Sequence, residues 1–431
     1  MSELNEKLFD FIKRSPTAFH AVKCAAEEFE ASGFERLEEG AKWDLRRGGA
    51  YFVTRNLSSI IAFKVPAGCV SGFMIASSHS DSPMFKIKEN PEMRDKCFVK
   101  LSTERYGSML LAPWFDRPLS FAGRVVVRTK DGIESRLVDC ERPFCVIPSV
   151  SIHFNRKANE DAAYNPAVDT IPLAGIGADV SVKREAARLA GVPEDDVLAH
   201  DLFVYNPEGG VEYAGAISAP RLDDLECAFA SVKALTGAEP KGAIPVCCIF
   251  DNEEVGSATK QGAASTFLED VLCRISDALG IEGGVKSLLP SSFMASCDNA
   301  QGVHPNHPEL YDKCNSVYMN GGIVIKYNAN QKYTTDAVSA AIMKLVCEAS
   351  GVPHQAYSNR ADIPGGSTLG SISDTKVSVN TVDIGLSQIA MHSCYETAGA
   401  DDLGYLVLAL EKLFSSSVNA SSDGRYSLNL K

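Results

Sequence analysis

A short apolar run at residues 243–250 ends abruptly in a group of acidic side chains, Asp251, Glu253 and Glu254. The run is rich in Val, Ile and Cys, which is typical of a buried strand rather than a helix. Charged side chains at the carboxyl end of a strand occupy the position where open α/β sheets bind ligands. Neighbouring Glu253 and Glu254 point in different directions, so one can bind a metal while the other moves a proton. Taken alone, the group could equally be a solvated acidic turn.

Other predicted strands also end in side chains that can bind metals. Asp223 differs from them, because it lies at the start of a predicted helix. An acidic side chain at that position can have a purely structural role, which is to stabilise the helix N-terminus. A histidine at a strand end is a structural side chain more often than a ligand, but its recurrence beside carboxylates favours metal binding. The strand-end candidates are His79 and Asp81 after residues 72–77, Asp298 after residues 293–296, and His392 after residues 377–384.

Together these residues fit a site for two metal ions. One zinc ion usually takes three or four protein ligands, so five candidates fit two ions and a shared carboxylate better. Mixed imidazole and carboxylate ligands suit Zn, with Mn and Co as alternatives. Glu253 is then left over to act as a general base. The five candidate ligands are His79, Asp223, Glu254, Asp298 and His392.

The order of the predicted elements indicates an α/β fold with a β-rich insertion. Short apolar strands alternate with stretches of helical periodicity, which favours a sheet whose faces are covered by helices. Between residues 89 and 218 the pattern changes to short strands, with a strong hairpin signal at Lys130-Asp131-Gly132. We therefore predict an α/β domain at residues 1–88 and 219–431, interrupted by the insertion at residues 89–218.

Two segments are expected to lack regular structure. Residues 155–177 are polar and rich in Ala, Asn, Pro and Gly, which indicates a long exposed loop. Residues 415–422 are polar and are expected to form a frayed tail. His153 lies just before the long loop, and its position alone is equally compatible with a functional and a structural role.

The charge balance excludes some classes of partner. The chain has 42 basic and 55 acidic side chains and a formal net charge of -13. It has no basic block that could follow phosphates, so we expect no nucleic-acid partner. It also has no apolar signal core and no run of about 20 apolar residues, so we expect a cytoplasmic protein without a membrane span. The 13 cysteines form no CxxC pair and are expected to be reduced and buried.

Five motifs resemble those of the M18 metalloaminopeptidases, the aspartyl aminopeptidase family, and follow one another in the same order as in that family. The resemblance covers almost the entire chain. The resemblance implies a zinc-peptidase-like catalytic domain with a mixed central sheet flanked by helices. It also implies that the β-rich insertion serves assembly into a homo-oligomer, usually a dimer-based tetrahedral dodecamer. The motifs are His79-Ser80-Asp81-Ser82-Pro83, Pro220-Arg221-Leu222-Asp223, residues 251–257, Asp298 ahead of His304-Pro305-Asn306, and Met391-His392-Ser393.

The resemblance also implies how the metal ligands are divided. His79 and Asp298 would hold one divalent ion, Glu254 and His392 would hold the other, and Asp223 would bridge the two. Zinc is the expected metal, with Mn or Co as alternatives.

Further roles follow from the same resemblance. Glu253 would be the general base, Asp81 would orient His79, and His153 would assist the active site of a neighbouring subunit. The substrate would be a peptide with a free N-terminus, whose first residue, Asp or Glu, is removed. The implied substrate-binding residues are Lys326, Tyr333, Gly366 and Ser367.

Three other functions stay open at this point. The first is an aminopeptidase of the same family that prefers neutral or basic first residues. The second is a carboxypeptidase or deacylase on the same fold, which would need a cationic clamp for a substrate carboxylate. The third is a non-enzymatic assembly protein that uses the metals structurally, although such a site needs no spare glutamate beside an open position.

Overall fold

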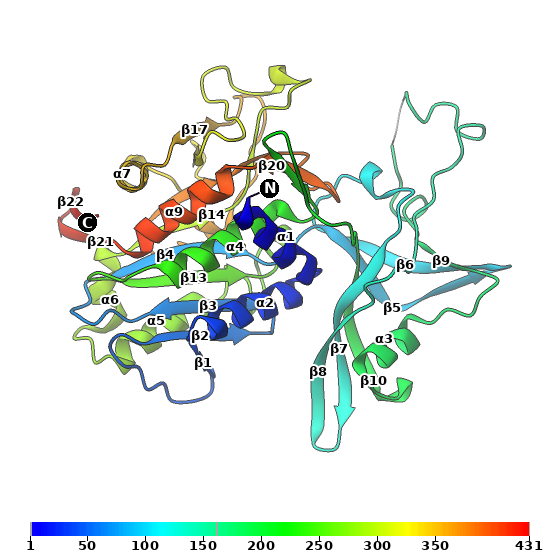
Figure 1. Cartoon of the computed structure of the whole chain (residues 1–431), viewed down its shortest axis with the longest axis horizontal. Helices are drawn as coiled ribbons and strands as arrows, with labels where there is room; N and C mark the ends of the chain where they lie inside the picture. The colour runs from blue at the N-terminus through cyan, green and yellow to red at the C-terminus, as the bar shows by residue number, and fades with distance from the viewer. Residues whose placement is uncertain (1, 161–162, 431) are drawn as a thin grey trace.

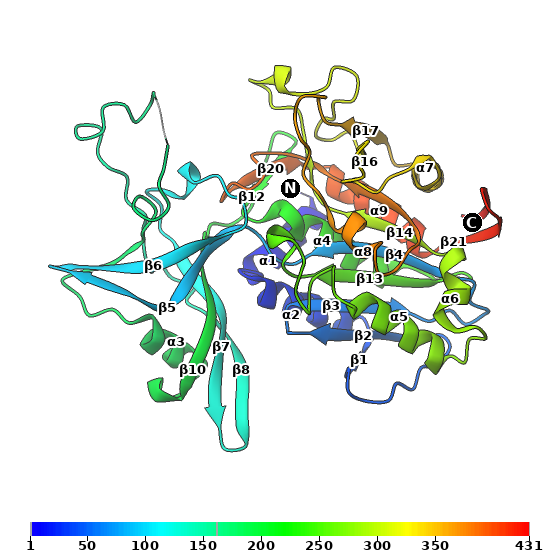
Figure 2. The same ribbon diagram turned by 180° about the vertical axis from the view of Figure 1, so that it is seen from behind.

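Two large β-sheets lie at opposite ends of the molecule (Figure 1). The structure is a computed structural model that describes residues 2–160 and 163–430. One sheet has nine strands and is packed between helices. The other has six strands, and the helix α3 (Val182–Ala190) packs against it. Figure 2 shows the same arrangement from behind.

Nine strands of mixed direction form the first sheet. In spatial order they are β1 (Glu35–Leu37), β2 (Ala50–Arg55), β3 (Ser59–Lys64), β13 (Ile244–Phe250), β4 (Phe73–His79), β14 (Phe293–Cys297), β18 (Asn380–Gly385), β16 (Ile323–Tyr327) and β17 (His354–Ser358). β4 pairs in parallel with both β13 and β14, whereas β13 and β3 are antiparallel. Every residue of β4 and of β13 is buried, as expected for strands covered on both faces.

Helices cover both faces of this sheet. The face seen in Figure 1 packs against α1 (Glu3–Arg14), α2 (Ala18–Ala31), α4 (Leu222–Gly237), α7 (Ala337–Ser350) and α9 (Asp402–Phe414). The face seen in Figure 2 packs against α5 (Phe267–Ala278), α6 (Gly284–Leu288) and α8 (Leu369–Ser373). Each face has its own apolar core, so the mixed central sheet flanked by helices is confirmed.

The second sheet is antiparallel throughout. Its strands, in spatial order, are β8 (Gly132–Asp139), β7 (Ser120–Thr129), β10 (Val197–Tyr205), β5 (Met84–Asp95), β6 (Phe98–Tyr106) and β9 (Leu173–Ile176). The chain enters this sheet directly after β4 and leaves it at Tyr205. The domain limits at residues 89 and 218 stay a prediction.

A smaller sheet is built from strands that come from separate parts of the chain. Its strands, in spatial order, are β11 (Val211–Tyr213), β12 (Ala216–Ala219), β20 (Glu396–Gly399), β19 (Ser387–Ile389) and β15 (Ala300–Gln301). β12 leads into α4, and β20 follows the loop that carries His392. Because β12 and β20 pair, the start of α4 and the His392 loop are held together.

One expectation about irregular segments is wrong, and a second holds only in part. Residues 415–422 are not a frayed tail, because β21 (Ser417–Ser422) pairs with β22 (Arg425–Asn429) and Val418 is buried in the core. The loop predicted at residues 155–177 contains β9, which pairs with β6; residues 161 and 162 of that loop lie outside the described residues.

Short 3₁₀ helices occur at Ala112–Trp114, Glu194–Asp196, Glu253–Val255, Leu289–Ser291 and Pro308–Leu310.

The expectations about membranes and cysteines have different outcomes. Among the described helices, none is long and apolar enough to cross a membrane. The cytoplasmic location stays a prediction. The thirteen cysteines are free, but Cys69, Cys97 and Cys314 are exposed, so the expectation that all are buried is wrong.

Candidate metal centre

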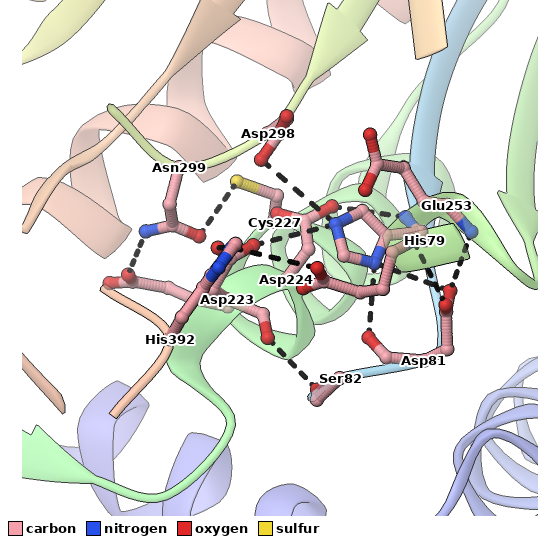
Figure 3. A network of polar contacts seen from close by, with 12 residues as sticks. His79, Asp81, Ser82, Asp223, Asp224, Cys227, Glu253, Asp298, Asn299 and His392 are labelled. Carbon is pink, nitrogen blue, oxygen red and sulfur yellow. Dashed lines mark hydrogen bonds and ion pairs between the residues drawn. The ribbon is translucent and has the colours of Figure 1, made fainter. Parts of the chain in front are cut away.

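Three neighbouring strands of the main sheet deliver side chains to one edge. β4 ends at His79, β13 leads into the turn that carries Glu253 and Glu254, and β14 is followed by Asp298. Because β13, β4 and β14 are adjacent and parallel, their carboxyl ends meet at the same edge of the sheet. Figure 3 shows Asp298 and the start of α4 close to His79.

The small sheet brings the remaining two candidates to this edge. Asp223 lies in the first turn of α4, after β12, and His392 lies in the loop before β20. Pairing of Ala219 with Glu396 aligns the two segments. All five predicted metal ligands therefore come from separate parts of the chain and converge at one place.

The ligand atoms of the described residues fall into three groups, and each two of these groups share one residue. Asp223 belongs both to a group with His79 and Asp298 and to a group with Glu254 and His392, and the atoms of each group lie within 4.8 Å of one another. The first group also includes Asp224, and a third group joins His79 to Glu253 and Glu254.

The two oxygens of Asp223 face different imidazoles. His79 Nε2 lies 3.4 Å from Asp223 Oδ1, and His392 Nε2 lies 3.5 Å from Asp223 Oδ2. His392 Nε2 is also 3.5 Å from Glu254 Oε2. Two ligands on one tetrahedral zinc ion, with bonds of about 2.0–2.2 Å, lie roughly 3.3–3.6 Å apart. These three donor pairs are therefore spaced as zinc ligands are, whereas His79 Nε2 and Asp298 Oδ1 are farther apart, at 4.0 Å.

The carboxylates of this cluster are buried close together, so their charged forms need a positive charge nearby. Burial raises the pKa of Glu254 and of Asp298, and the nearby Asp223 raises both further. Burial also raises the pKa of Glu253 to about 8. Among the described residues, Asp223 Oδ1 and Glu254 Oε1 have no hydrogen-bond partner although both atoms are buried. A buried acceptor without a donor costs free energy, and a divalent cation would supply the missing partner.

Asp81 connects His79 to the acidic turn. His79 Nδ1 donates a hydrogen bond to the main-chain oxygen of Asp81 at 3.0 Å and lies 3.5 Å from its carboxylate Oδ1. This contact leaves Nε2 free to face the ligand cluster. The Asp81 carboxylate also accepts hydrogen bonds from the backbone N–H groups of Glu253 at 3.1 Å and Glu254 at 3.2 Å.

Glu396 has a central place that the sequence did not reveal. One of its oxygens accepts a hydrogen bond from His392 N at 2.7 Å, and the other accepts one from Asp223 N at 3.0 Å. Its side chain is buried. Asp224, which was also missed as part of the site, accepts a hydrogen bond from His79 N at 3.0 Å. Both residues act on backbone N–H groups, and no motif spacing signals such contacts.

The predicted substrate-binding residues differ in their burial and in their distance from the candidate ligands. Lys326 is only 2% exposed, and its Nζ donates to Asn299 O at 2.8 Å and lies 3.7 Å from Asp298 Oδ2. The Tyr333 ring lies 5.5 Å from this ammonium group. Gly366 and Ser367 are exposed in the loop before α8.

His153 lies outside the ligand groups of its own chain. It is exposed on the insertion, in the segment before residues 155–177. None of the three ligand groups found among the described residues includes it. Its predicted role in a neighbouring subunit stays a prediction.

We expect Glu396→Gln to destabilise the protein even without metal. The amide keeps one acceptor oxygen, so either Asp223 N or His392 N would face an NH₂ group and lose its partner. An unsatisfied buried N–H costs about 1–3 kcal/mol. Urea unfolding in the presence of a chelator measures this loss, with the exposed Glu282→Gln as control. An unchanged free energy of unfolding for Glu396→Gln would show that the two hydrogen bonds contribute nothing.

Comparison with known proteins agrees with this geometry. The family described as "Aminopeptidase I zinc metalloprotease (M18)" matches residues 11–414. The "Probable M18 family aminopeptidase 2" of Clostridium acetobutylicum is 43% identical over 429 residues, which cover 96% of this chain and 99% of that protein.

Solved structures extend the similarity to the fold. The "Cryo-EM structure of the Ape4 and Nbr1 complex" matches with a TM-score of 0.92 and 33% identity, over 95% of this chain and 85% of that chain. The "Structure of S. cerevesiae mApe1 dodecamer" matches with a TM-score of 0.82 and 26% identity, over 95% of each chain. With near-complete coverage in sequence and structure, this chain belongs to the M18 family of zinc metalloproteases and is a metalloaminopeptidase.

Proposed function

We propose that this aminopeptidase removes an N-terminal Asp or Glu from peptides with a two-metal site in which Glu253 is the general base. The observation that carries the proposal is the position of Asp223, whose two carboxylate oxygens face the imidazoles of His79 and His392. A carboxylate shared in this way is the usual bridge between two metal ions. Membership of an aminopeptidase family removes the carboxypeptidase and the non-enzymatic alternatives.

The five ligands would divide between two sites. His79 and Asp298 would hold the first ion, Glu254 and His392 would hold the second, and Asp223 would bridge them. Bound divalent ions, zinc in the first place, would polarise the scissile carbonyl and lower the pKa of the attacking water. The separations of 3.4 and 3.5 Å between ligand atoms support this division.

Glu253 is proposed to move the proton. It shares a ligand group with His79 and Glu254 but is not needed to complete either proposed metal site. Its backbone is anchored by the hydrogen bond to Asp81, so its carboxylate is held beside the ligands. From there it can accept a proton from the attacking water and pass it to the leaving amine.

Glu253→Gln is the test of this mechanism. The amide cannot accept the proton, so kcat should fall by about 10²–10⁴, the usual contribution of a general base. Wild type and variant should both bind two zinc ions per chain, measured by metal analysis after dialysis. The proposal is wrong if the variant turns over within a few fold of wild type, or if active wild type holds a single ion.

Preference for an acidic first residue needs a local cation, because the chain has a net charge of -13. Lys326 supplies one beside the site, with Tyr333 next to it as a neutral donor. A hydrogen bond between an ammonium group and a carboxylate contributes roughly 1.5–3 kcal/mol, or ten- to hundredfold in discrimination. Preference for neutral or basic residues remains the alternative, because Lys326 already contacts Asp298 and Asn299.

Lys326→Met separates a role in selectivity from a role in holding Asp298. Methionine keeps the length of the side chain and removes its charge. We expect kcat/KM for aspartyl and glutamyl substrates to fall roughly ten- to hundredfold more than for leucyl and lysyl substrates. Equal losses on all four substrates would assign Lys326 to the support of Asp298 alone. Tyr357→Phe, on the neighbouring strand β17, is a control for packing near this strand.

The insertion is proposed to carry a subunit contact and to bring His153 to a neighbour's site. A structure with this fold is described as a dodecamer, which supports a homo-oligomer. Large apolar side chains are exposed on the insertion at Ile152, Phe154 and Val168, and Phe154 is 90% exposed. Exposed apolar side chains that gather on one segment are typical of protein interfaces.

Substitutions on this segment test the assembly. Phe154→Asp should shift the protein to a smaller species in sedimentation and lower its activity, because a buried interface does not accept an unpaired carboxylate. His153→Ala should lower kcat without changing the mass, whereas the exposed Arg156→Ala should change neither. A wild-type monomer with full activity would exclude a role for His153 in a neighbour's site.

A further inference from the structure

Tyr106 links the six-stranded sheet to the metal centre. It is the last residue of β6, and its hydroxyl donates a hydrogen bond to Asp81 Oδ2 at 2.6 Å. The same hydroxyl oxygen accepts a hydrogen bond from Asn252 Nδ2 at 2.8 Å. A side chain from the insertion therefore lies between the two loops that carry His79 and Glu253.

The contacts of Asn252 determine which group donates and which accepts in each of these hydrogen bonds. Asn252 Oδ1 accepts hydrogen bonds from Thr259 Oγ1 and from Gln261 Nε2, both at 2.8 Å. The amide nitrogen of Asn252 must therefore be the atom that faces Tyr106. Because Tyr106 accepts from Asn252, its own proton points to Asp81.

The hydroxyl contacts the residue on which the catalytic turn depends. The Asp81 carboxylate accepts the backbone N–H groups of Glu253 and Glu254 and lies 3.5 Å from His79 Nδ1. These partners belong to the catalytic segments themselves. In the described part of the chain, Tyr106 is the side-chain donor to this carboxylate that comes from the other sheet.

The surroundings keep Tyr106 in this role. Its ring packs edge-on against Phe203 of β10, with the ring centroids 5.6 Å apart. Burial, together with the charge of Asp81, raises the pKa of Tyr106, so the hydroxyl stays a proton donor. A cavity of about 240 Å³ borders Tyr106 and Asp81, but the cations in its wall, Lys86 and Arg124, are both bound to Asp201.

We propose that Tyr106 is a positioning residue through which the insertion sheet fixes the Asp81 carboxylate, and with it His79 and the Glu253–Glu254 turn, for metal binding and turnover. This inference rests on the two-metal site proposed above. Without the hydroxyl, the Asp81 carboxylate keeps the N–H groups of Glu253 and Glu254, which belong to the turn itself, and loses its anchor in the second sheet. Tyr106 acts through Asp81, whose contact with the ligand His79 is of the kind whose loss typically costs 10–100-fold in metal affinity or activity.

Tyr106→Phe tests the inference, because it removes one oxygen and keeps the ring. We expect zinc to bind 10–100-fold more weakly in competition with a chromophoric chelator, and kcat to fall while KM stays within about threefold. Tyr205→Phe is the matched control. Tyr205 lies in β10 of the same sheet and donates to Asp139 Oδ1 at 2.7 Å, so its loss should leave zinc affinity and kcat unchanged.

A double-mutant cycle with Asp81→Asn shows whether Tyr106 acts through Asp81. In the Asp81→Asn background, Tyr106→Phe should change zinc affinity by less than about twofold, because the carboxylate that it positions is already gone. Independent, additive losses would overturn the inference. If Tyr106→Phe does not fold, Asn252→Gly tests the link from its other side, since glycine accepts the positive φ of 62° at this position. It should also weaken zinc binding, and unchanged affinity would contradict the inference.

The outcomes separate this inference from the proposed function. A wild type that binds two zinc ions, with Tyr106→Phe equal to it in zinc affinity and kcat, overturns the inference alone. A wild type that binds fewer than two ions overturns the two-metal site, and the inference with it.

Discussion

Mutual repulsion between buried carboxylates governs the centre of this protein. Asp223, Glu254 and Asp298 crowd around two imidazoles at one edge of the main sheet. Burying such charges without partners is costly. The surrounding contacts hold them in place, since Glu396 ties the backbones of Asp223 and His392 together. The fold thus keeps like charges close together, in groups of side chains that could hold a metal ion.

Much of this site could be predicted because it follows from the ends of parallel strands. Apolar runs that stop at His79, Asp251 or Asp298 identify β4, β13 and β14, and parallel strands bring their carboxyl ends to one edge. The approach of Asp223 to His392 could not be predicted in this way. It depends on the pairing of β12 with β20, which lie far apart in the sequence and carry no shared local pattern.

Other features could not be predicted from the sequence, because tertiary contacts override local composition. The serine-rich segment at residues 417–422 forms a strand because β22 pairs with it and Val418 reaches the core. Lys326, at a strand end where a lysine is usually solvated, is buried because Asp298 and the Asn299 carbonyl take up its charge. Tyr106 could not be identified either, since nothing near it in the sequence points to Asp81.

The interrupted main sheet has a consequence for how the chain folds during synthesis. β4 lies between β13 and β14, and both of these strands are made only after the whole second sheet has emerged. At about 5–20 residues per second, β4 waits on the order of ten seconds for its neighbours. During that time a strand that is wholly buried in the folded protein has two open edges, which is a hazard for aggregation. The nascent protein therefore has a window in which a chaperone would protect the strand that later carries His79.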